Sequence, residues 1–235
     1  MIIVIVVYVA ATTARIVHAL KVGKRVSQNS TPFQKISPSF EEHILVLGDS
    51  TMYGAGIKHK ANTMGGLLAA RYPKATIETL ARNGDKVDDL RGQLADARFN
   101  EYLLLMIGVG GNDIVGLTRL NHLETELNAF IEQASQKSSQ IVIFQCVNVG
   151  NIGFFLFPLN YFYSRRCYLV SKVFEHVTSK YKNVLFVNLY RPNSDDFYTK
   201  KTRNKFIAED SFHPSDYANI FFFNLICDRM QTWGK

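Results

Sequence analysis

The sequence HILVLGDST, residues 43–51, joins a short apolar run to a turn that carries glycine, aspartate and serine. A continuous apolar run of this length is typical of a strand that is buried on both faces, as in a parallel sheet covered by helices. Four more short runs follow along the chain, at residues 75–81, 102–109, 141–147 and 184–189. We therefore expect five strands.

Between these runs, apolar residues recur at the spacing of a helix over residues 86–98, 118–134, 165–182 and 215–230. Strands that alternate with helices predict an α/β domain, a three-layer α/β/α sandwich with a five-stranded parallel sheet. The run at 75–81 alternates between polar and apolar residues, which predicts an edge strand. In such a fold the pocket lies beyond the carboxyl ends of the strands.

The composition is that of an ordinary globular domain. The chain has 235 residues, of which 47% are hydrophobic and 20% charged, and this excludes a disordered or low-complexity protein. The net charge is +7, but five of these positive charges lie in residues 1–38, which contain no acidic residue. The body shows no basic face with interleaved aromatic residues, so we expect no nucleic-acid partner. The three cysteines lack the spacing of a zinc site, and we expect no bound metal.

The first 25 residues form a hydrophobic segment, and residues 2–14 carry no charge. Residues 2–20 as a helix would span roughly 28 Å, close to the thickness of a bilayer's hydrocarbon core. Three interpretations stay open: a signal peptide, a single-pass membrane anchor, and a segment packed on the domain. The anchor is favoured because the segment lacks a basic start and a small-residue cleavage site.

We therefore expect three parts: residues 1–25 as a hydrophobic segment and membrane anchor, 26–40 as a linker, and 41–235 as the globular domain. Residues 26–40 are polar and contain two prolines, as linkers often do. The anchor predicts a membrane-associated protein, and basic residues after it favour the cytoplasmic side. A cytoplasmic or a secreted protein is the alternative.

Polar and glycine-rich residues follow four of the predicted elements. They are Gly48-Asp49-Ser50-Thr51, Arg82-Asn83-Gly84-Asp85, Gly110-Gly111-Asn112-Asp113 and Asp210-Ser211-Phe212-His213-Pro214. The fold would bring these four segments to the same edge of the sheet. Taken singly, each has an ordinary structural explanation: Asp49 and Ser50 as helix caps, Gly84 and Gly110 as turn glycines, and Asn112 and Asp113 as an Asx turn or cap.

Together, these residues predict nucleophilic catalysis. A serine hydroxyl needs an adjacent base, so Ser50 would attack while His213 takes its proton. Asp210, three residues before His213, would hold the other ring nitrogen and fix the tautomer. The amides of Ser50 and Gly84 and the side chain of Asn112 would form an oxyanion hole.

The four segments resemble the SGNH (GDSL-type) hydrolases, a family of esterases. The matching residues are Gly-Asp-Ser at 48–50, Gly84, Gly-x-Asn-Asp at 110–113 and Asp-x-x-His-Pro at 210–214, within about residues 43–231. The resemblance implies a flavodoxin-like SGNH fold and hydrolysis of esters or thioesters without a metal or other cofactor. It also implies Ser50, Asp210 and His213 as the triad, and the Ser50 amide, Gly84 and Asn112 as the oxyanion donors. The second segment matches least well, because family members often have Ser-Gly where this chain has Asn83-Gly84.

The substrate is less well defined by the sequence. Residues 149–168 are rich in aromatic residues, either as a wall for an acyl chain or as a surface that enters lipid, or else as ordinary core. We expect a small-molecule or lipid-like acyl ester, with a carbohydrate acetate as the alternative. Two other classes remain open: a metallophosphoesterase, which the missing histidine near 48–50 disfavours, and a membrane-tethered binding domain without activity. The oligomeric state is not predicted.

Overall fold

The computed structural model describes residues 30–192 and 202–233, together with short helical pieces at residues 8, 12–14, 17, 21–22 and 25–26. Most of the predicted anchor, residues 2–20, lies outside the described residues and stays a prediction. Among the helices that the structure does describe, none has the length and apolar character needed to cross a bilayer.

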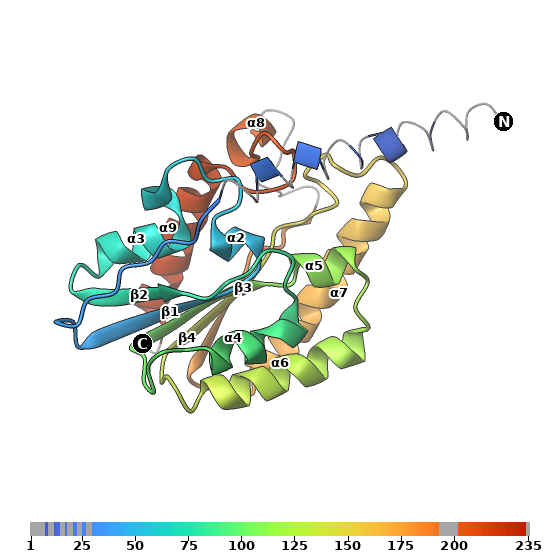
Figure 1. The fold of residues 1–235 in the computed structure, drawn as a ribbon. Coiled ribbons are helices and arrows are strands. Elements are labelled where there is room, and N and C mark those ends of the chain that lie inside the picture. Colours follow the sequence, from blue (N-terminus) through green and yellow to red (C-terminus); the bar gives the residue numbers. More distant parts are fainter. Residues whose placement is uncertain are drawn as a thin grey trace.

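Five parallel strands form one sheet in the order β2-β1-β3-β4-β5 (Figure 1). The prediction of a five-stranded parallel sheet is therefore confirmed, as is the edge position of the second strand. The strands are β1 (Glu42–Gly48), β2 (Ala75–Thr79), β3 (Leu104–Val109), β4 (Ile141–Gln145) and β5 (Val184–Asn188).

Helices cover both faces of the sheet, which gives the three layers (Figure 1). On one face α3 (Met64–Arg71) packs against α9 (Asp216–Thr232), and on the other α6 (Leu120–Ala134) packs against α4 (Leu90–Ala95) and α7 (Leu159–Thr178). Along the chain, short helices stand between these elements. They are α2 (Ser50–Tyr53), α5 (Gly111–Val115) and α8 (Arg203–Phe206), with the 3-10 helices η1 (Lys60–Asn62) and η2 (Val87–Asp89).

The continuous apolar strands are buried as their composition predicts. Ile44, Leu45, Val46 and Leu47 of β1 are all fully buried, because helices cover both faces of this inner strand. Their side chains alternate between the two faces and so contribute to the core on each side of the sheet.

Part of the predicted linker packs against the sheet. Lys35 exchanges two backbone hydrogen bonds with Ile77 of β2, of 2.9 and 2.8 Å. The side chain of Gln34 accepts from the Thr79 N–H and donates to the Thr79 carbonyl oxygen. Because an open sheet edge exposes unpaired backbone groups, this segment protects the outer edge of β2.

One helix begins earlier than expected. The sequence predicts a helix over residues 165–182, whereas α7 already begins at Leu159. Pro158 is its N-cap residue, and proline is tolerated at a helix start because the first amides have no partner within the helix. The aromatic stretch 149–168 is thus half loop and half helix.

Candidate active site

The turn after β1 is held in place by close contact with β3. Gly48 pairs with Gly108, and its φ of +134° lies in a region that favours glycine. A Cβ atom at Gly48 would lie 2.0 Å from the carbonyl oxygen of Gly108, so no larger residue fits. The Asp49 N–H donates to the same oxygen, and α2 starts at the next residue, Ser50. The serine is thereby presented at the carboxyl end of the sheet.

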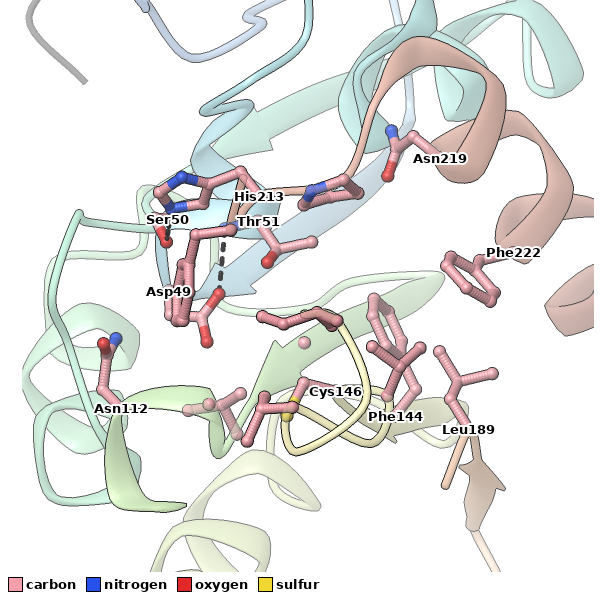
Figure 2. A pocket seen from close by; sticks show the side chains of 18 of the residues that line it. Asp49, Ser50, Thr51, Asn112, Phe144, Cys146, Leu189, His213, Asn219 and Phe222 are labelled. Carbon is pink, nitrogen blue, oxygen red and sulfur yellow. Dashed lines mark hydrogen bonds between the residues drawn. The ribbon is translucent and has the colours of Figure 1, made fainter. Parts of the chain in front are cut away.

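The structure brings Ser50, His213 and Asp210 together. His213 Nε2 lies 2.8 Å from Ser50 Oγ, and His213 Nδ1 lies 2.5 Å from Asp210 Oδ2. The imidazole ring thus connects a hydroxyl with a carboxylate, as in the serine–histidine–aspartate arrangement. Figure 2 shows the ring of His213 beside Ser50. The side chain of Asp210 is completely buried, and that of His213 is 13% exposed.

The loop before α9 positions Asp210 and His213 relative to each other. Asp210 Oδ1 accepts hydrogen bonds from the backbone N–H groups of Phe212 and His213, at 3.0 and 2.9 Å. Burial by itself would raise the pKa of Asp210, but the hydrogen bond and charge of His213, together with these amides, hold that pKa below its usual value. Asp210 therefore stays ionised and can stabilise a protonated imidazole.

Asn112 faces the same pocket from the other side. It is the second residue of α5, which begins directly after β3. Asn112 Nδ2 donates to the carbonyl oxygen of Asp85 at 2.9 Å. An amide nitrogen carries two protons, so one proton remains for a ligand in the pocket. The backbone N–H of Ser50 donates to no group within the described part of the chain, so it too is free for a ligand.

Gly84 lies in the loop after β2. It directly precedes Asp85, whose carbonyl oxygen accepts the hydrogen bond from Asn112. Its φ is +89°, and a Cβ atom there would meet no neighbour within 4 Å. The residues that line the pocket do not include Gly84. The role of Gly84 as an oxyanion donor therefore stays a prediction. The positive φ of the turn is enough to explain why this residue is a glycine.

An apolar pocket leads away from Ser50. In Figure 2, Ser50 and Asn112 lie at one end, and Leu189 and Phe222 lie at the other. The lining is mostly apolar in character. It includes Met64, Val109, Phe144, Cys146, Val147, Val149, Ile152, Leu189, Phe212 and Phe222.

Asp49 is a buried carboxyl next to Ser50. Its Oδ1 accepts from the Thr51 N–H at 2.9 Å, which caps α2, and only 5% of the residue is exposed. Burial raises the pKa of Asp49 to about 6. The folded state therefore holds this proton more tightly than the unfolded chain, and its stabilising effect is lost as the pH rises through 6.

We expect Asp49→Asn to remove this pH dependence. Asparagine keeps the capping oxygen but carries no charge that burial could penalise. The free energy of unfolding of the variant, minus that of the wild type, should increase by about 2 kcal/mol between pH 4 and pH 7. Urea unfolding at several pH values measures this difference. A difference in free energy of unfolding that stays constant between pH 4 and pH 7 would contradict the raised pKa of Asp49.

Two residues near the site carry hydrogen bonds that no motif indicated. Gln93 of α4 is fully buried, and its amide bonds to both backbone groups of Gly48. Asp113, expected as part of a turn or cap, is also fully buried and accepts from the Val87 N–H. The sequence does hold a signal for Gln93, because it shares a helix face with the buried Leu90 and Leu94.

A comparison with protein families matches residues 46–219 to the GDSL-like lipase/acylhydrolase family. The matched range contains Ser50, Gly84, Asn112, Asp210 and His213. A search of curated protein sequences finds no match.

Solved structures with a similar fold include several esterases. A psychrotrophic esterase from Pseudoalteromonas sp. is 18% identical, with a TM-score of 0.58 over 82% of this chain and 98% of that one. An acetylxylan esterase from Geobacillus stearothermophilus is 17% identical, with a TM-score of 0.56 over 83% and 96%. An extracellular lipase from Streptomyces rimosus is 14% identical, with a TM-score of 0.55 over 80% and 98%. At these identities the likeness is one of fold.

Proposed function

The chain belongs to the GDSL-like lipase/acylhydrolase family and is a carboxylester hydrolase, and we propose that it cleaves acyl esters through an acyl-enzyme on Ser50. The observation that carries the proposal is the position of the His213 ring, 2.8 Å from the Ser50 hydroxyl and 2.5 Å from the Asp210 carboxylate. A binding domain without activity would have no need for this alignment.

In the first half of the reaction, Ser50 Oγ attacks the acyl carbonyl carbon while His213 Nε2 takes the hydroxyl proton. The carbonyl oxygen gains negative charge, which the Ser50 amide and Asn112 Nδ2 stabilise, together with the Gly84 amide in this proposal. The new imidazolium is stabilised by the buried Asp210. His213 then gives its proton to the departing alcohol, and the acyl group stays on Ser50.

In the second half, a water molecule takes the place of the alcohol. His213 removes a proton from this water, and the resulting hydroxide attacks the acyl carbon. The same donors stabilise the second tetrahedral intermediate. His213 returns the proton to Ser50 Oγ, the acid is released, and the site is restored.

The pocket supports an acyl chain over a sugar acetate as the substrate. A sugar needs several polar partners, whereas this lining consists mostly of apolar side chains that run from Ser50 to Leu189 and Phe222. An acyl chain in the pocket would bury its methylene groups there, worth about 0.8 kcal/mol each. We therefore propose a lipid-like ester or thioester as the substrate, with a carbohydrate acetate as the alternative.

A chain-length series tests this substrate class. On p-nitrophenyl esters and matching thioesters from acetyl to dodecanoyl, we expect kcat/KM to rise by about fourfold for each added methylene until the pocket is full. Leu189→Trp, which fills the far end, should move the optimum to shorter chains and leave acetyl turnover within about threefold of the wild type. A wild-type preference for acetyl esters, with no effect of Leu189→Trp, would favour the carbohydrate alternative.

We also propose that the domain touches a membrane surface through an exposed aromatic patch. The patch consists of Phe157, Tyr161 and Phe162, which are 72%, 62% and 50% exposed at the start of α7. The exposed Arg165 follows three residues after Phe162, and residues 149–174 contain no acidic residue. Exposed aromatic rings beside cations are suited to the interface of an anionic bilayer.

A series of ring contacts connects the patch with the residue next to His213. Phe212, next in sequence to His213, contacts the ring of Phe154 at a centroid distance of 5.6 Å. Ring contacts continue from Phe154 to Phe155 and from there to Tyr163, the neighbour of Phe162. In this proposal, a lipid-like substrate passes from the bilayer along these rings to the pocket, which Phe212 lines.

A single tryptophan reports on this contact. In a Trp233→Phe background, which removes the chain's one native tryptophan, Phe157→Trp should shift its emission to the blue on vesicles with anionic lipid. Brominated lipids should quench it. Leu103→Trp, just before β3 at the other end of the sheet, is the matched control and should show neither effect. Equal emission of Phe157→Trp with and without vesicles would contradict the proposal.

A further inference from the structure

Gln93 holds the backbone of the turn that presents Ser50. Its Oε1 accepts from the Gly48 N–H, and its Nε2 donates to the Gly48 carbonyl oxygen, both at 2.8 Å. The side chain is fully buried, so these groups have no water to replace the bonds. A two-point contact of this kind fixes both the position and the rotation of the Gly48 peptide groups, two residues before the nucleophile.

The same amide also holds the loop that positions Asn112. Gln93 Nε2 donates a second hydrogen bond, 2.7 Å long, to Asp85 Oδ2. The backbone carbonyl of Asp85 in turn accepts from Asn112 Nδ2. A chain of hydrogen bonds therefore runs from Gly48 through Gln93 and Asp85 to Asn112. Three segments that are far apart in the sequence meet in it.

This series of hydrogen bonds connects the two sides of the oxyanion hole. One side is the amide of Ser50, which follows the Gly48 turn, and the other is the side chain of Asn112. An oxyanion hole works only when its donors are held at fixed distances from the developing charge, and losing one donor typically costs a factor of about 10² to 10³ in kcat. Small displacements of either donor therefore matter for the rate.

We propose that Gln93 and Asp85 are positioning residues, which set the distance between the Ser50 amide and Asn112 Nδ2. The inference rests on the proposed function, since it concerns the same oxyanion hole. Neither residue lines the pocket, so neither touches the substrate. Their effect on the reaction passes through the donors that they hold.

Asp85 provides the cleaner test, because it is partly exposed and its replacement removes no bond to the Gly48 backbone. We expect Asp85→Ala to lower kcat by about 10- to 30-fold with KM changed by less than threefold. Asp85→Asn keeps an oxygen acceptor for Gln93 and should restore most of the lost rate. Asp88→Ala, an exposed carboxylate nearby that binds His122, is the matched control and should leave kcat unchanged.

A double-mutant cycle with Asn112→Ala separates positioning from a merely structural role. If Asp85 acts through Asn112, then Asp85→Ala should lower kcat by less than twofold once Asn112 is already alanine. Gln93→Met, which removes the hydrogen bonds to both Gly48 and Asp85, should lower kcat more than Asp85→Ala. If Gln93→Met fails to fold, the Asp85 series still decides the question.

Three outcomes would overturn the inference. The first is a kcat of Asp85→Ala within threefold of the wild type, and the second is a double variant whose loss in kcat equals the product of the losses in Asp85→Ala and Asn112→Ala. The third is a kcat of Asp85→Asn as low as that of Asp85→Ala. Each variant is also labelled with a fluorophosphonate at Ser50. A wild type that is not labelled at Ser50 would reject the proposed function itself. Full labelling of the wild type with no effect of the Asp85 variants would reject only the positioning role.

Discussion

Ser50→Ala is expected to lower kcat on a short p-nitrophenyl ester by about five to six orders of magnitude. Without Oγ no acyl-enzyme forms, and the remaining groups can only stabilise a direct attack by water. The fold should be unaffected, because the side-chain oxygen of Ser50 contacts only His213 among the described residues. Steady-state kinetics measure the loss, and thermal unfolding shows that the variant is folded.

Ser179→Ala serves as the control for this variant. Ser179 is an exposed serine that follows α7, far from the pocket, and its replacement should leave kcat within twofold of the wild type. A Ser50→Ala variant that is folded and retains a tenth or more of the wild-type rate would remove Ser50 from the mechanism.

Asp210→Asn is expected to lower kcat by about four orders of magnitude. Asp210 Oδ1 accepts from two backbone N–H groups, so the oxygen of an asparagine amide has to stay on that side. Its NH₂ group would then face His213 Nδ1, which becomes the acceptor. The ring proton moves to Nε2, and Nε2 can no longer take the proton of Ser50.

The measurement combines kinetics with the detection of the histidine tautomer by nitrogen NMR. Asp228→Asn, an exposed carboxylate near the end of α9, is the control and should have no effect on either. A rate within tenfold of the wild type, with the proton still on Nδ1, would show that Asp210 does not orient the ring.

Much of the fold follows from the apolar runs of the sequence. The buried strands β1, β3 and β4 read as continuous apolar stretches because helices cover both faces of the sheet. The meeting of Ser50, Asn112 and His213 follows from the same cause, since parallel strands bring their carboxyl ends to one edge. No individual motif predicted that these residues meet. The prediction came from the order of all four segments relative to the strands.

The long-range side-chain contacts could not be predicted in this way. Helical spacing places Gln93 on the buried face of its helix, but its two partner residues, Gly48 and Asp85, lie 45 and 8 residues away in the sequence. Residues 34 and 35 pair with β2 through two backbone hydrogen bonds of Lys35, which any residue except proline can form, and through the side chain of Gln34. Such contacts depend on the assembled fold and leave little trace in local composition.

The central claim is that His213 activates the Ser50 hydroxyl as a nucleophile. It is tested most directly by reaction of the full chain with a fluorophosphonate probe, followed by mass spectrometry of the peptides. We expect one phosphonyl group per chain, on Ser50, with labelling slowed at least about 100-fold in His213→Ala. A chain that stays unlabelled, or a label on another residue that persists in Ser50→Ala, would contradict the account.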